Sequence, residues 1–180
     1  MVETETANSA GNAAGVAVPE KKRGLGILIT RLTLGVTTLA TWIDNVSKDF
    51  YDGENFPGFF DFQFREAPDG NGSSLTFVHD ILNATILQAP EFFGWILTFF
   101  ELSIAIGLIF GVFTRATALG AVAFFAGLFL VYFGGEEWIW TYVLLLSAAV
   151  AIFLDWGGRV LGVDQLIAKA RGESPFGLIW

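Results

Sequence analysis

The sequence predicts an all-α fold: an integral membrane four-helix bundle that forms a single domain. The first reason is composition, because 53% of the 180 residues are hydrophobic and the mean hydropathy is +0.57, which is high for a soluble domain. The second reason is the presence of four apolar stretches, each near the roughly 20 residues that cross a hydrocarbon core about 30 Å thick. These stretches are Leu25–Ile43, Phe92–Phe113, Ala116–Phe133 and Trp138–Leu154.

The first apolar stretch follows a polar tail. Residues 1–23 are mostly small and polar, without periodicity, and we expect a disordered cytoplasmic tail there. Lys21-Lys22-Arg23 before an apolar run also resembles a secretory signal. However, the run contains Arg31 and continues to Trp42 without a cleavage site followed by a polar segment. We therefore interpret it as a retained span.

The basic residues predict an orientation with both termini in the cytoplasm. In this orientation two of the ten basic residues, Lys48 and Arg65, lie outside, while most of the others lie inside. The inner ones are Lys21, Lys22, Arg23, Arg115, Arg159, Lys169 and Arg171. We therefore expect a multi-pass protein of the cell membrane, N-in and C-in, with a long extracellular loop between the first two spans.

That loop runs from Asp44 to Glu91 and has two parts. Its first part, from Phe56 to Phe64, is dense in phenylalanine, which places it at the membrane interface or over the mouth of the bundle. In the second part, residues 73–87 have apolar residues at helical spacing after Ser73-Ser74, which we interpret as a helix cap. This pattern predicts an amphipathic helix on the outer surface.

The composition limits the cofactors and partners. The chain has no cysteine and a single histidine, His79, so we expect no haem, iron–sulfur cluster or copper centre in it. Any redox chemistry would then use a bound organic cofactor or a partner.

The net charge of −8 argues against nucleic acid as a partner, and acid excess with few lysines favours a halophilic source. The alternative is an ordinary acidic membrane protein.

Two charged residues inside the apolar stretches are the candidate site. Glu101 lies near the middle of the second stretch and Arg31 interrupts the first. A charge inside a membrane span costs about 2.5–3.5 kcal/mol on insertion scales, so its retention needs a reason. One interpretation is a polar site that holds a quinone carbonyl or passes a proton. The alternatives are a structural Arg31–Glu101 ion pair between the helices, or an Arg31 that extends toward the inner interface.

Other polar positions are weaker candidates. Gly35, Thr38 and Trp42 follow Arg31 at helical spacing on one helix face, and we assign them as possible cofactor-binding residues. We expect His79 to be a solvated residue of the surface helix. Asp155, Arg159 and Asp164 closely follow the last apolar stretch, and the plain interpretation is a solvated helix end.

Three segments resemble the DoxX family and its DoxD relatives. They are Arg31-x-x-x-Gly35, the stretch from Phe100-Glu101-Leu102 to Thr114-Arg115, and the ending Gly158-Arg159-x-x-Gly162-x-Asp164. The likeness covers about residues 24–168, which implies a four-span membrane domain followed by a cytoplasmic tail at 169–180. The resemblance implies a small membrane subunit of a quinone-linked oxidoreductase, as in thiosulfate:quinone oxidoreductase.

The leading hypothesis is therefore a subunit of a quinone-reducing complex, with Glu101 and Arg31 at a quinone pocket. We expect membrane lipid and another protein subunit as partners, with electrons delivered at the acidic outer face. The first rival is a non-enzymatic membrane scaffold or assembly factor in which the Glu101–Arg31 pair is structural. A small-solute or proton carrier ranks last, because four helices are few for alternating access.

Overall fold

The computed structural model describes residues 20–155 and 157–172, and these are helical with no strand. The predictions for residues 1–19, Trp156 and residues 173–180 lie outside the described residues. The elements follow the chain in this order: α1 (Glu20–Ser47), α2 (Asn55–Phe64), α3 (Thr76–Ala84), η1 (Ile86–Gln88), α4 (Pro90–Phe110), α5 (Thr114–Tyr132), α6 (Trp140–Leu154), η2 (Gly157–Arg159) and α7 (Val163–Arg171).

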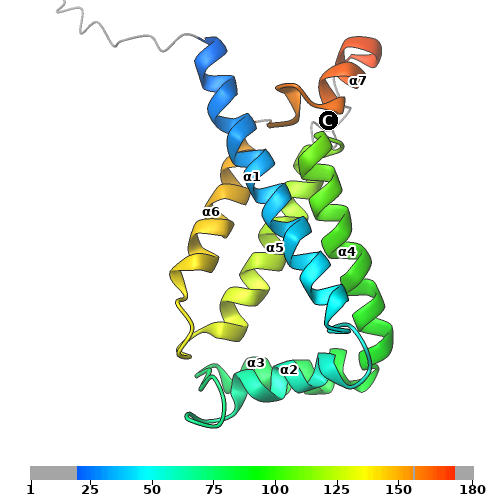
Figure 1. The fold of residues 1–180 in the computed structure, drawn as a ribbon. Helices are drawn as coiled ribbons and strands as arrows, with labels where there is room; N and C mark the ends of the chain where they lie inside the picture. The colour runs from blue at the N-terminus through cyan, green and yellow to red at the C-terminus, as the bar shows by residue number, and fades with distance from the viewer. Residues whose placement is uncertain (1–19, 156, 173–180) are drawn as a thin grey trace, which may run out of the picture.

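The long helices α1, α4, α5 and α6 pack into one bundle (Figure 1). Its core is apolar and is centred on buried residues such as Leu34, Leu108 and Ile152. Within the described residues, three helices are long and apolar enough to cross a membrane: Gly24–Ser47 within α1, then α4 and α5. The stretch predicted as the fourth span forms α6, an apolar helix of 15 residues, which is shorter than those three.

α4 and α5 are joined by a tight turn at the end of the bundle nearest α7. α4 begins with a proline at its first turn and ends at Gly111, whose φ of 65° is left-handed. Phe113 also has a positive φ, of 47°, and α5 begins directly after it. The helix boundary predicted at Phe113 is therefore three residues too late.

The long connection between α1 and α4 forms what we call the platform, residues 55–88. Its helices α2 and α3 lie across the end of the bundle opposite α7 (Figure 1). Phe56, Phe60 and Val78 form a buried cluster with Val131 of α5. Phe56 and Phe60 of α2 thus cover the mouth of the bundle, whereas Phe62 is exposed.

Polar contacts join the platform to the connection between α5 and α6. The Ser73 and Ser74 hydroxyls donate to the carbonyl of Phe133, at 3.2 and 3.1 Å. This corrects the prediction that these serines cap a helix, because α3 has no side-chain cap bond. Asn71 is buried, and its Oδ1 accepts the backbone N–H groups of Glu136 and Glu137.

Small residues allow the closest helix contacts. A Cβ added to Gly35 of α1 would lie 3.0 Å from the backbone nitrogen of Ile109 in α4. Gly107 of α4 packs equally closely against the side chain of Thr117 in α5. The backbones approach closely at these points, as small residues permit in membrane helices.

Candidate functional site

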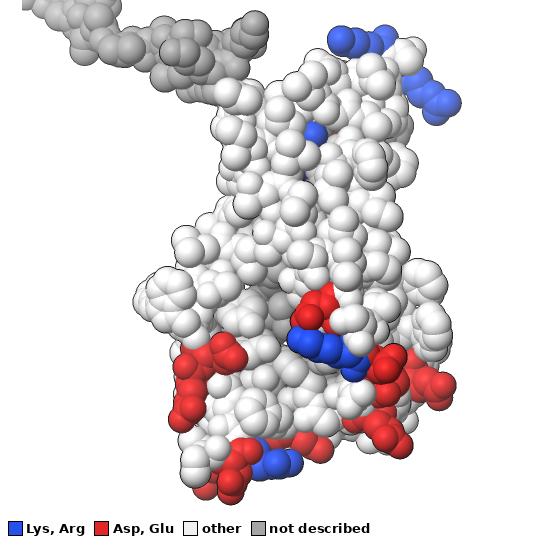
Figure 2. All heavy atoms as spheres, in the orientation of Figure 1, with Lys and Arg blue, Asp and Glu red and all other residues white. Residues whose placement is uncertain are grey.

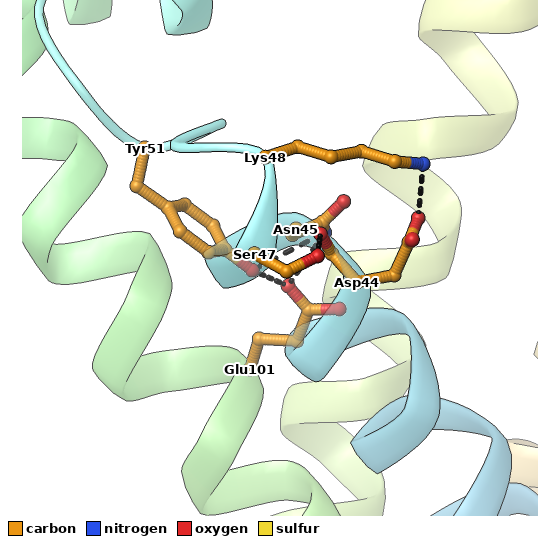
Figure 3. A network of polar contacts seen from close by, with 6 residues as sticks. All are labelled: Asp44, Asn45, Ser47, Lys48, Tyr51 and Glu101. Atoms are coloured by element: carbon orange, nitrogen blue, oxygen red, sulfur yellow. Dashed lines mark hydrogen bonds and ion pairs between the residues drawn. The ribbon is translucent and has the colours of Figure 1, made fainter.

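The carboxyl group of Glu101 is the centre of a buried polar cluster near the platform. The side chain is 1% exposed, although it lies on an otherwise apolar helix. Its Oε2 accepts a hydrogen bond from the hydroxyl of Tyr51 and a longer one, at 3.4 Å, from the Asn45 side-chain amide (Figure 3). The same amide donates to the Tyr51 hydroxyl oxygen at 3.2 Å, so the three side chains form a closed triangle. Oε1 of Glu101 is buried without a partner.

The chain after α1 is shaped to bring Tyr51 to Glu101. α1 ends at Ser47, and the backbone turns back through Asp49, which has a φ of 51°. The amide of Phe50 then donates to the carbonyl of Asn45, which closes the turn. Gly94 makes the approach possible, because a Cβ there would overlap the carbonyl group of Tyr51. This glycine lies two turns before Glu101 on α4.

Tyr51 keeps its proton throughout the physiological pH range. Burial raises the pKa of the phenol well above its usual value, and the hydrogen bond to Glu101 raises it further. The hydroxyl is therefore available as a donor, and Glu101 is its acceptor. Tyr51 also lines a hollow that opens at the platform end of the bundle, so it connects Glu101 to the surface.

This hollow has a volume of about 330 Å³. Its acidic lining residues are Asp49 and Asp52 in the connection after α1 and Glu91 at the start of α4. Farther along α4, Trp95 and Thr98 also line it. Trp95 is 60% exposed and stacks on Phe99, with ring centroids 6.0 Å apart.

Arg31 does not pair with Glu101, so the ion pair that the sequence left as an alternative does not form, and the single polar site predicted to hold both residues is wrong. Its guanidinium donates to the carbonyls of Gly157 at 2.9 Å and Leu161 at 3.3 Å, at the α7 end of the bundle. Glu101 is bonded near Asn45, and 14 residues of helix separate Asn45 from Arg31, or about 20 Å at 1.5 Å per residue. Arg31 is also only 1% exposed, so it does not extend into water.

Asp164 is a buried structural residue that the sequence interpretation missed. We predicted a solvated helix end, yet its side chain is 1% exposed. Its carboxylate accepts the backbone N–H groups of Phe113 and Thr114, at 2.8 and 2.7 Å, and so satisfies the start of α5. It also lies close enough to Arg31 to stabilise the guanidinium charge. By contrast, Asp155 is exposed as predicted.

The three predicted cofactor-binding residues have different surroundings. Gly35 is a packing residue, and the Thr38 hydroxyl donates to the carbonyl of Leu34 within α1. Trp42 is half-buried, and its indole N–H is buried without a partner. Since Gly35 contacts Ile109 and Asn45 contacts Glu101, the register places Trp42 at about the level of Glu101.

His79 is part of the platform rather than a solvated side chain. It stacks on Phe64, with ring centroids 4.7 Å apart, and its Nε2 lies 3.9 Å from Asp61 of α2. It therefore joins α3 to α2. In the described part of the chain, no three His, Cys, Asp or Glu side chains gather as a metal site would require.

The fold and these two buried polar clusters define a small helical membrane protein with a carboxylate–phenol pair near one end of its bundle. A family model described as DoxX matches residues 26–135, more than half of the chain. The chain therefore belongs to the DoxX family. No solved structure matches it.

All three motif segments meet at the α7 end of the bundle, the second of them through its last residues. Arg31 bonds to the backbone of the segment that ends in Asp164, and Asp164 bonds to the backbone at Thr114. Glu101 belongs to the same motif segment as Thr114, but it lies toward the platform, with Tyr51 and Asn45. The sequence did carry a signal that Asp164 matters, which is its position in the closing motif. A prediction that considers only the charge of a residue near a helix end does not use that signal.

Proposed function

We propose that this protein is the membrane subunit of a quinone-linked oxidoreductase of the thiosulfate:quinone type. Its quinone site would be the hollow lined by Tyr51, Trp95 and Thr98, with Glu101 behind it. The single observation that carries the proposal is the Glu101 carboxyl group, buried in a membrane helix and bonded to a phenol that also lines the hollow. A carboxyl group in that position is expensive to keep unless it handles protons or a ligand.

The proposal includes four spans and both termini in the cytoplasm. α6 would be the fourth span: its 15 residues rise about 22 Å, and local thinning of the bilayer would compensate for the rest. The charges favour this orientation, because Lys169 and Arg171 lie at the α7 end while acidic side chains gather at the platform end (Figure 2). The platform and the hollow would then face outward.

The chemistry of the site is proton delivery. When bound, a quinone takes up two electrons and two protons and becomes a quinol. The electrons would come from a donor that a partner subunit oxidises at the outer face; for thiosulfate, two ions lose one electron each as a sulfur–sulfur bond forms between them. The Tyr51 hydroxyl would donate one of the two protons to a quinone oxygen in the hollow, and a protonated Glu101 would replace it. The second proton would come from water at the open mouth of the hollow.

The remaining residues would hold the ring. Trp95 presents an exposed indole face at the wall of the hollow, against which a planar ring can stack. Thr98 lies one turn before Glu101 and also lines the hollow, although its hydroxyl already donates to the carbonyl of Gly94. Asn45 would hold the Glu101 carboxyl in place from the α1 side.

The test is quinone-dependent turnover of the native complex carrying single substitutions. Glu101→Gln keeps the shape but removes the titratable proton, and Tyr51→Phe removes only the hydroxyl. Each should lower turnover by roughly 10²-fold, the usual scale of general acid–base catalysis. Glu66→Gln, an exposed carboxylate of the connection after α2, is the matched control and should change nothing.

The result also decides between this proposal and a scaffold. If both variants assemble with the partner and turn over normally, the Glu101 cluster has a structural role and the proposed function is wrong. The scaffold alternative draws on one observation, the contact of Arg31 with residues more than a hundred positions later in the chain. That contact holds the bundle together whatever the chemistry of Glu101.

A further inference from the structure

A second cavity, of about 310 Å³, lies between α4 and α5 where the platform crosses them. α4 contributes Leu97 and Phe100, and α5 contributes Phe124 and Gly127. The platform closes the end of the cavity with Phe60 and Leu82. Figure 1 shows the reason for the space: α4 and α5 meet at their tight turn and diverge toward the platform.

The lining determines the chemistry of a ligand. Every lining residue is apolar, so the cavity offers no charged or hydrogen-bonding side chain to a polar group. An engineered apolar cavity of roughly 150 Å³ already stays dry and binds benzene, and this one has about twice that volume. Water is therefore a poor occupant, and a hydrocarbon ligand is a good one.

The position of the opening identifies the source of the ligand. Ile96, Phe100 and Leu130 line the cavity and remain partly exposed on the outside of the bundle. They belong to α4 and α5, two of the helices that are long and apolar enough to cross a membrane. The platform covers the other approach, so the cavity opens sideways toward the hydrocarbon of the bilayer.

We propose that this cavity binds one hydrocarbon chain of a membrane lipid, which fills the wedge between α4 and α5 and supports the platform from the side that faces the bundle. The proposal goes beyond the proposed function and does not rest on it. The residues of α4 that line this cavity, such as Phe93 and Phe100, lie on a different side of the helix from Glu91 and Trp95, which line the hollow at Tyr51.

Gly127 allows the cavity to be filled without disturbing the bundle. It lines the cavity, and a Cβ added to it meets no atom within 4 Å. Gly127→Phe should therefore place a ring where the lipid chain would lie. Gly26→Phe is the matched control, because Gly26 of α1 also has no atom within 4 Å of an added Cβ and does not line the cavity.

The experiment uses the full chain in bilayer nanodiscs that contain a phospholipid with a photoreactive diazirine in one acyl chain. After irradiation, mass spectrometry locates the crosslinked residues. In the unmodified chain we expect crosslinks concentrated on the cavity lining, at Leu97, Phe124 and Leu128. Gly127→Phe should reduce them about ten-fold, and Gly26→Phe should leave them unchanged.

Three results would overturn the proposal. One is an undiminished yield in Gly127→Phe, and another is crosslinking spread evenly over the exposed faces of α4 and α5. The third is competition by an added long-tailed quinone but not by unlabelled phospholipid, which would make the occupant a quinone tail. Gly127→Leu repeats the test with a smaller side chain if the Phe variant does not fold. Glu101→Gln should leave the crosslinks intact, so this test fails or succeeds separately from the proposed function.

Discussion

At the scale of single residues, the buried charges of the described residues form two separate clusters with different surroundings. Glu101 is bonded to neutral side chains, Tyr51 and Asn45, and one of its oxygens has no partner. Arg31 is bonded to carbonyl groups and lies near the carboxylate of Asp164. A fully partnered group such as Asp164 has a structural role, whereas a buried carboxyl with a free oxygen can still accept a ligand or a proton.

The role of Asp164 predicts a large loss of stability when it is removed. Asp164→Ala leaves Arg31 without its nearby carboxylate and leaves two N–H groups at the start of α5 without an acceptor. We expect the free energy of unfolding to fall by about 2–5 kcal/mol, because each buried N–H group left without an acceptor costs about 1–3 kcal/mol. The measurement is thermal unfolding of the purified protein in detergent. Asp155→Ala, at an exposed carboxylate nearby, should stay within about 0.5 kcal/mol of the unmodified chain.

The separation of the two clusters predicts that Arg31 and Glu101 are independent. Unfolding of Arg31→Gln, Glu101→Gln and the double variant should give additive losses, with a coupling energy below about 0.5 kcal/mol. The physical reason is the roughly 20 Å of helix between the two groups. A double variant clearly more stable than the sum of the single losses would show that the two side chains meet.

At the scale of the helices, contacts at glycine set the distance between neighbours. Gly35 of α1 lies against the backbone of α4, and that contact fixes the register that brings Asn45 to Glu101. Gly94 allows Tyr51 to approach α4 from the other direction. The geometry of the candidate site therefore depends on residues that take no part in its chemistry.

A single methyl group should be enough to show this dependence. Gly35→Ala should lower the free energy of unfolding by about 1–3 kcal/mol, because the backbone nitrogen of Ile109 cannot move aside as a side chain would. Gly26→Ala, on the same helix with open space around it, should be neutral or slightly stabilising. Equal unfolding temperatures for the two variants, measured by circular dichroism, would contradict the close α1–α4 packing.

The helices were predictable from the sequence, and the pairing of their polar groups was not. Apolar stretches give the position of α1, α4, α5 and α6 to within a few residues, since hydropathy depends only on local composition. The partner of Arg31 depends on a segment 126 or more residues later, which no local pattern contains. Tyr51 was missed because it lies in an irregular turn, where the sequence gives no periodicity from which to infer the direction of a side chain.

At the scale of the whole molecule, charge distinguishes the two ends. The platform end carries acidic residues such as Asp61 and Glu66, and the α7 end carries Lys169 and Arg171 (Figure 2). A membrane between the two ends would then have the basic end on its cytoplasmic side.

This polarity predicts the outcome of cysteine labelling. The chain has no native cysteine, so Glu66→Cys and Lys169→Cys each introduce a single exposed thiol. In intact cells, an impermeant thiol reagent should label Glu66→Cys and should reach Lys169→Cys only after lysis. Labelling of Lys169→Cys in intact cells would reverse the proposed orientation.

The contact of Arg31 with residues late in the chain also affects the order in which contacts form during synthesis. The carbonyls that accept its hydrogen bonds belong to residues made 126 and 130 positions later. At about 5–20 residues per second, a ribosome needs roughly 6–25 s to reach them. Until then α1 carries a cation without its native acceptors, so we expect Arg31 to remain near the aqueous edge of the membrane. A chain cut short before residue 157 therefore keeps an Arg31 guanidinium without the carbonyl groups that accept its hydrogen bonds.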